Sequence, residues 1–322
     1  MKWIIETESL GKRYGDVTAV DDLCLRVAEG EIYCFLGLNG AGKTTTIRML
    51  LGMIKPTRGS ATILGKRIRL GSREPWSQVG YLVEIPHAYP ELTVTENLEV
   101  ARRLHPGTPL KAIRQVIERM GLAAYAHRRA GVLSQGNAQR LGLAKALLHN
   151  PKLILLDEPA NGLDPAGIVE IRELLLELTR QEGVTVFMSS HILAEVSRLA
   201  DRIGIIHEGR LLREMDIAGL ERERRRRLLV KARDSEAAWQ VLSASGYPGQ
   251  VLPDGILELN SPLAIEHPDE IASLLVLAGT PPMQLLVEEE ELEPYFLRMV
   301  GSDKDVSPVQ NMKRIKANGR GA

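Results

Sequence analysis

Hydrophobic and polar positions alternate through the first thirty residues, with breaks at Gly15 and Gly30. The apolar positions are Ile4, Ile5, Val17, Leu23, Leu25 and Val27. A period of two predicts strands of a half-exposed, antiparallel sheet. The unbroken apolar stretch 31–36 then predicts a buried strand, and the spacing over 45–51 predicts a helix after it. The chain therefore begins as a sheet and continues as an α/β unit.

Buried strands are predicted again over 79–83, 153–156 and 184–188, and a hairpin is predicted over 203–212. Asp164 and Pro165 have the residue types of a helix N-cap and first turn. Strands joined by helices favour a largely parallel sheet covered on both faces. Between about 84 and 150 helical patterns interrupt this alternation, so we expect an inserted helical subdomain.

The composition changes near residue 220. We expect a first domain over 1–219, a charged linker over 220–227, and a small α+β domain over 228–301. The last of these has the predicted order strand, helix, strand, strand, helix, strand, helix, which favours a ferredoxin-like unit. Residues 302–322 have no hydrophobic periodicity, and we expect a disordered tail.

The charge balance excludes one class of partner. Among 322 residues, 41 are Lys or Arg and 41 are Asp or Glu, and aromatic residues make up 4%. A strongly basic footprint and an extended base-stacking platform are both missing, so no nucleic-acid partner is expected. Two cysteines do not support a disulfide framework. The N-terminus lacks a signal-peptide core, and no run of about 18 apolar residues occurs, so we expect a cytosolic or peripheral protein.

A phosphate-binding motif follows the stretch 31–36. Residues 37–44 read Gly-Leu-Asn-Gly-Ala-Gly-Lys-Thr and fit G-x-x-x-x-G-K-[ST], the P-loop. The glycines let successive N–H groups point at a β-phosphate, and the Lys43 ammonium reaches the β and γ oxygens. The Thr44 hydroxyl is placed to bind Mg²⁺. The following helix adds the positive end of its dipole.

Two carboxylates follow the predicted strand 153–156. A buried strand places Asp157 at its carboxyl end, where Mg²⁺ held by Thr44 would lie. Glu158 follows and is the natural group to polarise an attacking water. About 20 residues earlier, Ser134 stands where an N-cap would be, which makes a second helix N-terminus available to an anion.

Together these motifs resemble the ATP-binding-cassette (ABC) ATPases. Residues 133–137, Leu-Ser-Gln-Gly-Asn, are similar to the LSGGQ signature of that family. The P-loop, Asp157-Glu158, the segment 161–164 and Ser189-Ser190-His191 occur in the family's order and spacing, over about residues 1–215. The resemblance implies a P-loop NTPase cassette, with a mostly parallel core sheet, an antiparallel N-terminal sheet and a helical insert.

The resemblance also implies residue roles. ATP would be bound by Tyr14, Asn39, Gly40, Ala41, Gly42, Lys43, Thr44, Thr45, Ser134, Gly136 and Asp164. Mg²⁺ would be held by Thr44, Asp157 and Glu84. Glu158 would be the catalytic base, and His191 would contact the γ-phosphate. Two cassettes would pack head to tail, so that Ser134 and Gly136 of one close over ATP on Lys43 of the other, most simply as a homodimer.

Two departures from the family pattern stand out. Glu84 occupies a position that is usually glutamine, which adds a negative charge near the phosphates, and either tighter Mg²⁺ binding or a disfavoured transition state could follow. A glutamate here is similar to the ATPases of bacitracin- and lantibiotic-type exporters, as is the segment 89–98. Gln135 and Asn137 depart from LSGGQ, whereas Ser134 and Gly136 keep it.

These resemblances imply an ATP-hydrolysing subunit of an exporter, peripheral on the cytoplasmic face of the cell membrane and docked to separate integral membrane permease subunits. The expected docking groove lies near residues 84–96, with Ile85, Tyr89 and Leu92 as contacts. Two alternatives remain open. One is a soluble cassette ATPase acting in translation or DNA maintenance, and the other is a nucleotide-gated regulatory subunit with low turnover.

Overall fold

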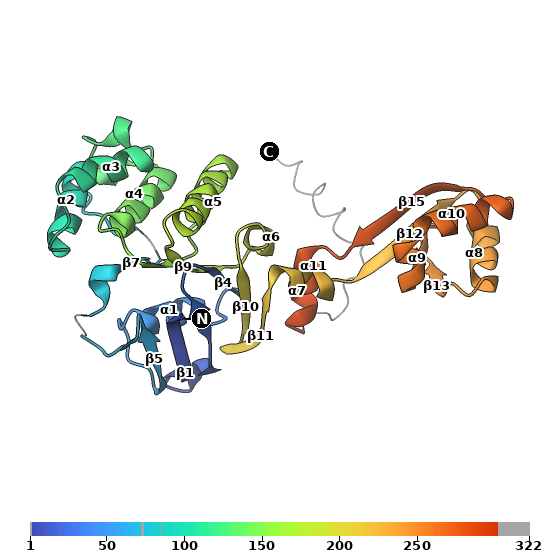
Figure 1. Cartoon of the computed structure of the whole chain (residues 1–322), viewed down its shortest axis with the longest axis horizontal. Coiled ribbons are helices and arrows are strands. Elements are labelled where there is room, and N and C mark those ends of the chain that lie inside the picture. Colours follow the sequence, from blue (N-terminus) through green and yellow to red (C-terminus); the bar gives the residue numbers. More distant parts are fainter. Residues whose placement is uncertain (1, 72–73, 85, 302–322) are drawn as a thin grey trace, which may run out of the picture. The chain divides into compact units, whose positions relative to one another are not determined.

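The computed structural model of the chain describes residues 2–71, 74–84 and 86–301, and it divides into two compact units, Met1–Gly219 and Leu220–Ala322 (Figure 1). The expected tail over 302–322 and the expected contact residue Ile85 lie outside the described residues. Each unit has its own sheet and hydrophobic core.

An antiparallel sheet opens the N-terminal unit, as the alternating pattern predicts. Its strand order is β2-β1-β5-β6, and β3 also pairs with β1. The strands are β1 (Trp3–Tyr14), β2 (Val17–Leu23), β3 (Arg26–Ala28), β5 (Arg58–Ile63) and β6 (Lys66–Arg67). The apolar side chains of Ile4, Ile5 and Leu23 are buried in the core below this sheet.

The central sheet of this unit has the order β11-β10-β4-β9-β8-β7, and every neighbouring pair except β10–β11 is parallel. The strands are β4 (Ile32–Leu36), β7 (Val79–Leu82), β8 (Leu153–Asp157), β9 (Thr185–Ser190), β10 (Arg202–His207) and β11 (Arg210–Asp216). Because parallel strands end at one edge, the residues after β4, β8 and β9 come together there.

Helices connect the parallel strands. They are α1 (Lys43–Leu50), η1 (Trp76–Gln78), α5 (Pro165–Arg180) and α6 (Leu193–Val196). Between β7 and β8 lie α2 (Val94–Leu104), α3 (Lys111–Arg119), η2 (Ala123–Tyr125), η3 (Ala130–Val132) and α4 (Gln135–Leu147). In Figure 1, α2, α3 and α4 form one group, apart from β1 and β5. Thr93 and Glu96 form a capping box at the start of α2.

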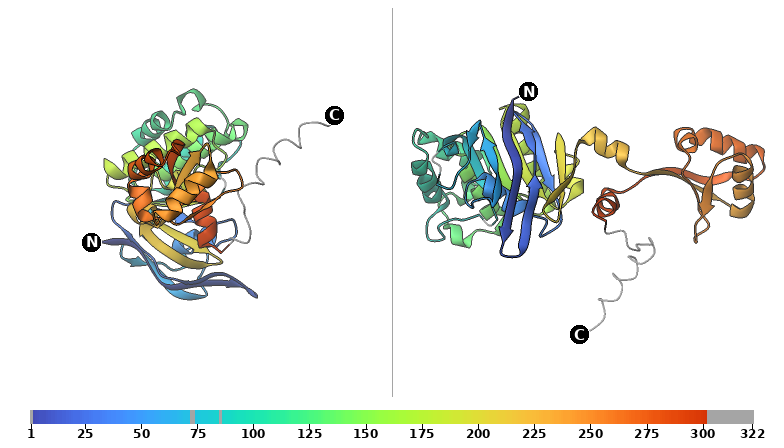
Figure 2. Two further views of the ribbon diagram at one scale, coloured as in Figure 1. Left: turned by 90° about the vertical axis from the view of Figure 1, so that its right-hand side faces the viewer. Right: turned by 90° about the horizontal axis from the view of Figure 1, so that it is seen from below.

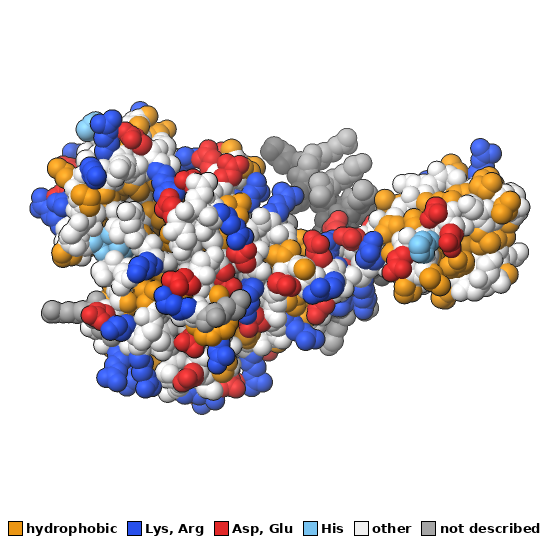
Figure 3. All heavy atoms as spheres, in the orientation of Figure 1, with side chains coloured by type: hydrophobic (Ala, Val, Ile, Leu, Met, Phe, Trp, Pro, Cys, Tyr) orange, Lys and Arg blue, Asp and Glu red, His pale blue; other side chains and the backbone are white. Residues whose placement is uncertain are grey.

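The C-terminal unit has the ferredoxin-like arrangement predicted for it (Figure 2). Its sheet has the order β13-β14-β12-β15 with every pair antiparallel. The elements are α7 (Ile217–Glu223), β12 (Arg226–Ala232), α8 (Ser235–Ala244), β13 (Gly249–Val251), β14 (Leu257–Leu259), α9 (Pro262–Glu266), α10 (Pro268–Leu277), β15 (Pro282–Glu289) and α11 (Leu292–Met299). Hydrophobic side chains lie along the face of this unit seen in Figure 3. Leu263, Val276 and Leu277 are among the exposed hydrophobic residues of the unit.

Most of the segment 220–227, which we expected to be a charged linker, belongs to regular secondary structure. Residues up to Glu223 belong to α7, and β12 begins at Arg226. Arg227 forms ion pairs with Glu258 and Glu288, and Arg224 and Arg226 each pair with Glu289. The arginine run is folded because its acidic partners lie on β14 and β15, which pair with β12.

A cavity of about 430 Å³ lies between β7, α2 and α4. On its wall the rings of His105 and His149 stack, with centroids 3.8 Å apart and planes 8° apart. Nε2 of His149 lies 3.2 Å from the carbonyl oxygen of Val79. Burial lowers the pKa of both imidazoles, and the neighbouring His105 helps to bring the pKa of His149 to about 4. The stacked pair is therefore uncharged at neutral pH.

The low pKa of His149 predicts an acid-sensitive contribution to stability. The pKa of His149 is about 4 in the folded protein and 6.5 in the unfolded chain, so between these values the unfolded chain binds a proton that the folded protein does not. The contribution of His149 to the free energy of unfolding is therefore complete above pH 6.5 and is lost as the pH falls toward 4. We expect His149→Gln to reduce the fall in Tm between pH 7 and pH 5, measured by thermal unfolding in parallel buffers. The exposed His127, replaced in the same way, is the control. An unchanged fall in the His149 variant would contradict the prediction.

Candidate active site

The P-loop follows β4 and has the backbone that its glycines predict. Gly42 is the N-cap of α1 with φ of +108°, and a Cβ there would stand 2.5 Å from the carbonyl oxygen of Ala19. Gly40 also has positive φ, at +83°. Glycine is therefore required where the loop turns into the helix. Asn39, Ala41 and Thr45 lie on the same loop and first helical turn.

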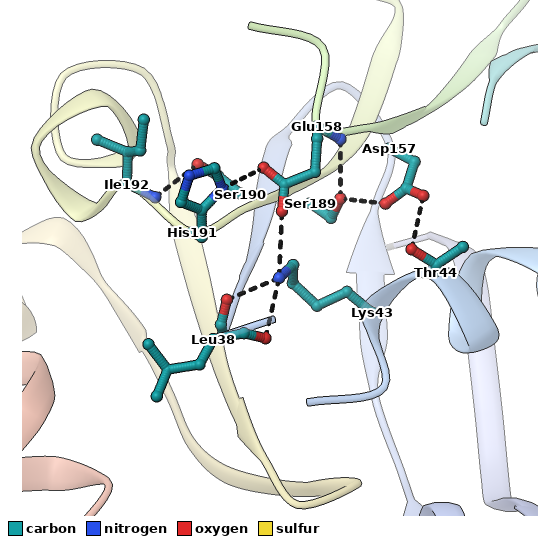
Figure 4. A network of polar contacts seen from close by, with 10 residues as sticks. Leu38, Lys43, Thr44, Asp157, Glu158, Ser189, Ser190, His191 and Ile192 are labelled. Carbon is teal, nitrogen blue, oxygen red and sulfur yellow. Dashed lines mark hydrogen bonds and ion pairs between the residues drawn. The ribbon is translucent and has the colours of Figure 1, made fainter. Parts of the chain in front are cut away.

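Lys43 is the first residue of α1, and its side chain is buried against the loop. Nζ donates hydrogen bonds to the carbonyl oxygens of Gly37, at 2.7 Å, and Leu38, at 3.2 Å. It also forms an ion pair of 3.1 Å with Oε1 of Glu158 (Figure 4). The P-loop lysine and the proposed base thus meet directly.

Asp157 ends β8 and is a buried carboxylate with two donors. Oδ2 accepts a hydrogen bond of 2.7 Å from the Thr44 hydroxyl, and Oδ1 accepts one of 2.6 Å from the Ser189 hydroxyl. The residue is 3% exposed. A buried polar group is costly unless hydrogen bonds compensate it, so the hydroxyls of Thr44 and Ser189 satisfy this carboxyl group and fix its orientation.

The role of Ser189 is not predicted from the sequence. It lies opposite Asp157 in the parallel register of β8 and β9, and its side chain is completely buried. Its Oγ also accepts a hydrogen bond of 3.0 Å from the backbone N–H of Glu158. The sequence shows only that a hydroxyl residue stands near the end of a largely apolar strand. The hydrogen-bond partners of Ser189 could not be predicted, because they depend on which strand lies beside β9.

Glu158 lies between Lys43 and His191. Its Oε2 is 2.7 Å from Nδ1 of His191, whose side chain is 39% exposed. Its backbone has φ of +50°, in the left-handed region that non-glycine residues rarely adopt. Such conformations are concentrated at functional sites. A cavity of about 160 Å³ lies beside Glu158 and His191. A carboxylate held in this way can accept a proton from a water molecule in the cavity.

Thr44 and Asp157 fit a site for Mg²⁺, because a hydroxyl and a carboxylate are hard oxygen ligands. Among the described residues, no group of three or more His, Cys, Asp or Glu side chains could hold a metal ion by itself. Mg²⁺ commonly completes its shell with water and substrate phosphates. Bound there with a nucleotide, it would neutralise charge on the phosphate oxygens.

Glu84, the third expected Mg²⁺ ligand, contacts a different partner. Its carboxylate accepts a hydrogen bond from the guanidinium of Arg48 on α1, and its backbone has φ of +60°. Among the contacts of residues 2–71, 74–84 and 86–301, none joins Glu84 to Thr44 or Asp157. The extra negative charge is therefore balanced by an arginine one helical turn beyond Thr44.

The remaining expected residues lie outside this cluster. Tyr14 ends β1, is 47% exposed, and has the Lys12 ammonium 4.9 Å from its ring centroid. The Ser134 hydroxyl caps α4, the helix whose first turn contains Gly136, by accepting a hydrogen bond of 3.3 Å from the N–H of Asn137. Asp164 caps α5 through the N–H of Gly167. No contact within the described part of the chain joins Tyr14, Ser134 or Asp164 to Lys43.

Gln135, the departure in the signature segment, packs on the loop that follows Glu158. A Cβ on Gly162 would stand 2.0 Å from the Gln135 amide nitrogen, and Gly162 has φ of +76°. The side chain of Gln135 therefore occupies the position that a Cβ would take if residue 162 were not glycine. It links the start of α4 to the segment 161–164.

Comparison with known sequences finds related families and proteins. The family described as ABC transporter matches residues 20–161, and the one described as AAA domain, putative AbiEii toxin, Type IV TA system matches 127–197. The bacitracin transport ATP-binding protein BcrA of Bacillus licheniformis is 41% identical over 94% of this chain and 98% of its own length. The lantibiotic transport ATP-binding protein SrtF of Streptococcus pyogenes is 37% identical over 68% of this chain and 93% of its own length.

Solved structures share the fold. The ATP-binding subunit of an ABC transporter superposes with a TM-score of 0.63 at 30% identity, covering 68% of this chain and 92% of that one. A dimeric bacterial ABC transporter cassette superposes with a TM-score of 0.62 at 26% identity, covering 66% and 98%. No helix among the described residues is long and apolar enough to cross a bilayer. The chain belongs to the ABC transporter family, in which it is an ATP-binding subunit and an ATPase.

Proposed function

We propose that this chain hydrolyses ATP to drive export through separate membrane-spanning subunits. The observation that carries the proposal is the position of Glu158, whose carboxylate contacts Lys43 on one side and His191 on the other. Lys43 binds the phosphates, and Thr44 and Asp157 hold Mg²⁺. The relatives named for bacitracin and lantibiotic transport support a peptide-like cargo.

Glu158 is the general base in this proposal. Its carboxylate accepts a proton from the water that attacks the γ-phosphate, and the Nδ1 contact of His191 fixes the direction of the carboxylate. Nε2 of His191 remains for the γ-phosphate. Lys43 balances the charge of Glu158 before nucleotide binds, and it then turns to the phosphate oxygens.

Two copies act together, head to tail. Ser134 is exposed at the N-terminus of α4 and has no contact with Lys43 within the described residues, so it is available to ATP on a second copy. A helix N-terminus favours an anion. The dimeric cassette with the same fold supports this arrangement. Asp164 and Tyr14 complete the composite site in the proposal, Tyr14 as the adenine-stacking residue.

The membrane partner docks on the cavity between β7, α2 and α4. Tyr89, which is 57% exposed, lines this cavity, and Leu104 is 75% exposed at its margin. Exposed apolar side chains around a hollow are typical of an interaction site. Leu92 is half-buried beside it. Docking there places the chain on the cytoplasmic face of the cell membrane.

Glu158→Gln tests the role of the base. The variant keeps the shape of the side chain but cannot take a proton, so we expect at least about a hundredfold loss of ATPase rate and an ATP-bound dimer that persists. Phosphate release measures the first, and light scattering with ATP and Mg²⁺ measures the second. Glu173→Gln, on the exposed face of α5, is the control. Continued turnover by the Glu158 variant would exclude this role.

Ser189→Ala tests the orientation of Asp157. Loss of the hydroxyl frees Oδ1 of Asp157 and the N–H of Glu158, so we expect the Mg²⁺ concentration for half-maximal hydrolysis to rise roughly tenfold. The neighbouring Ser190, whose hydroxyl accepts from the N–H of Ile192, provides the matched Ser190→Ala control. Equal Mg²⁺ curves for the two variants would show that Ser189 has no special part.

Glu84→Gln tests the glutamate in the usual glutamine position. The change removes the ion pair between Glu84 and Arg48. Because the side chains of Arg48 and Glu84 are 37% and 47% exposed, Tm should change little. We expect the ATPase rate or its Mg²⁺ dependence to change instead, measured by phosphate release over a Mg²⁺ titration. Glu91→Gln, in the same loop and 84% exposed, is the control. Identical kinetics would mean that the departure is neutral.

A further inference from the structure

The cavity between β7, α2 and α4 has an uneven charge. Its lining within the described residues includes Lys145, His87, His105 and His149 but no Asp or Glu. The rest of the lining is mostly apolar, and Leu82, Val100 and Ala146 are examples. One cation and three imidazoles thus face an apolar hollow with no carboxylate.

Lys145 is the fixed charge of this cavity. It projects from α4, and its Nζ donates a hydrogen bond of 2.6 Å to the carbonyl oxygen of His87. Burial lowers the pKa of this ammonium. No carboxylate of the described residues lies within ion-pair distance of it. A cation partly removed from water gains most from a carboxylate partner.

The acidic residues near the cavity are already paired. Glu99 on α2 forms ion pairs with Arg102 and Arg103, and Glu84, after β7, pairs with Arg48. Neither is available to Lys145 without breaking those contacts. The stacked His105 and His149 add no negative charge. Among the described residues, Lys145 therefore has a backbone carbonyl as its acceptor and no carboxylate partner, so a carboxylate from another molecule can pair with it.

We propose that the cavity receives a cytoplasmic segment of the membrane-spanning partner that presents apolar side chains and one carboxylate, and that this carboxylate pairs with Lys145. The inference rests on the docking site of the proposed function and adds the chemistry of the docked segment. Apolar contacts with Leu104 and Tyr89 bury hydrophobic surface of the segment, and the ion pair fixes the position of the segment along the cavity. A charge pair at such an interface selects the correct partner as well as strengthening the contact.

Crosslinking tests the position first. Leu104 and Leu110 are both leucines, 75% and 68% exposed, but only Leu104 borders the cavity. Each is replaced by cysteine in full-length protein carrying Cys24→Ser, because Cys24 is the exposed native cysteine and Cys34 is buried. A benzophenone attached at position 104 should capture a membrane-protein segment in native membranes, and one at position 110 should not.

Charge exchange then tests the carboxylate. We expect Lys145→Glu to reduce co-purification of the captured protein at least about tenfold, and Lys145→Arg to retain it. Lys152→Glu, the same reversal at an exposed lysine outside the lining, should have no effect. Replacing one Asp or Glu of the captured segment by Lys should restore binding to Lys145→Glu. ATP binding by each variant checks that it is folded.

The outcomes separate the two hypotheses. A captured segment without a carboxylate, or equal binding by Lys145→Glu and Lys152→Glu, would overturn the ion pair and leave docking at the cavity intact. Capture of a second copy of this chain, or of no membrane protein at position 104, would overturn the docking site and the inference together. The ATPase measurements on Glu158→Gln are independent of both results.

Discussion

The candidate active site depends on one buried carboxyl group, that of Asp157. It is 3% exposed, and its burial is tolerated because Thr44 and Ser189 each donate a hydrogen bond to it. Those donors come from the helix after β4 and from the end of β9, so the carboxylate ties together three segments far apart in the sequence. The parallel register that sets Asp157 opposite Ser189 is therefore a condition for the site, and the hydrophobic strands β4, β8 and β9 maintain it.

The same serine also supports the strained residue beside it. Glu158 has φ of +50°, a conformation that costs on the order of 1–3 kcal/mol. Its N–H donates to the Ser189 hydroxyl, and its carboxylate contacts Lys43 and His191, which offset that cost. The left-handed turn lets consecutive acids serve different partners: Asp157 faces Thr44, and Glu158 faces Lys43. A regular continuation of β8 would point the two side chains to opposite faces of the sheet.

The sequence was sufficient where a motif carries its own local geometry. The P-loop and the succession of strands and helices along both units follow from spacing and residue type. It was insufficient where a partner lies far away in the chain. The ion pairs of Arg224, Arg226 and Arg227 could not be predicted, because their partners are acids on β14 and β15. For the same reason the contacts of Ser189 with Asp157 and of Glu84 with Arg48 could not be predicted, since each needs the tertiary fold.

Strand β7 relates the cavity to the active site. Residues 79–83 line the cavity, and the parallel pairing of β7 with β8 sets Leu82 opposite Leu156, the residue before Asp157. A hydrogen-bonded strand pair buried in the core resists sliding, because one step of register would reverse every side chain. A segment bound in the cavity would therefore act less through the strands than through the residues after β7, where Glu84 is joined to α1 by the more exposed contact with Arg48. If a partner segment docks in the cavity as proposed, Glu84 would be a charged link between that cavity and α1, which an uncharged glutamine would make more weakly.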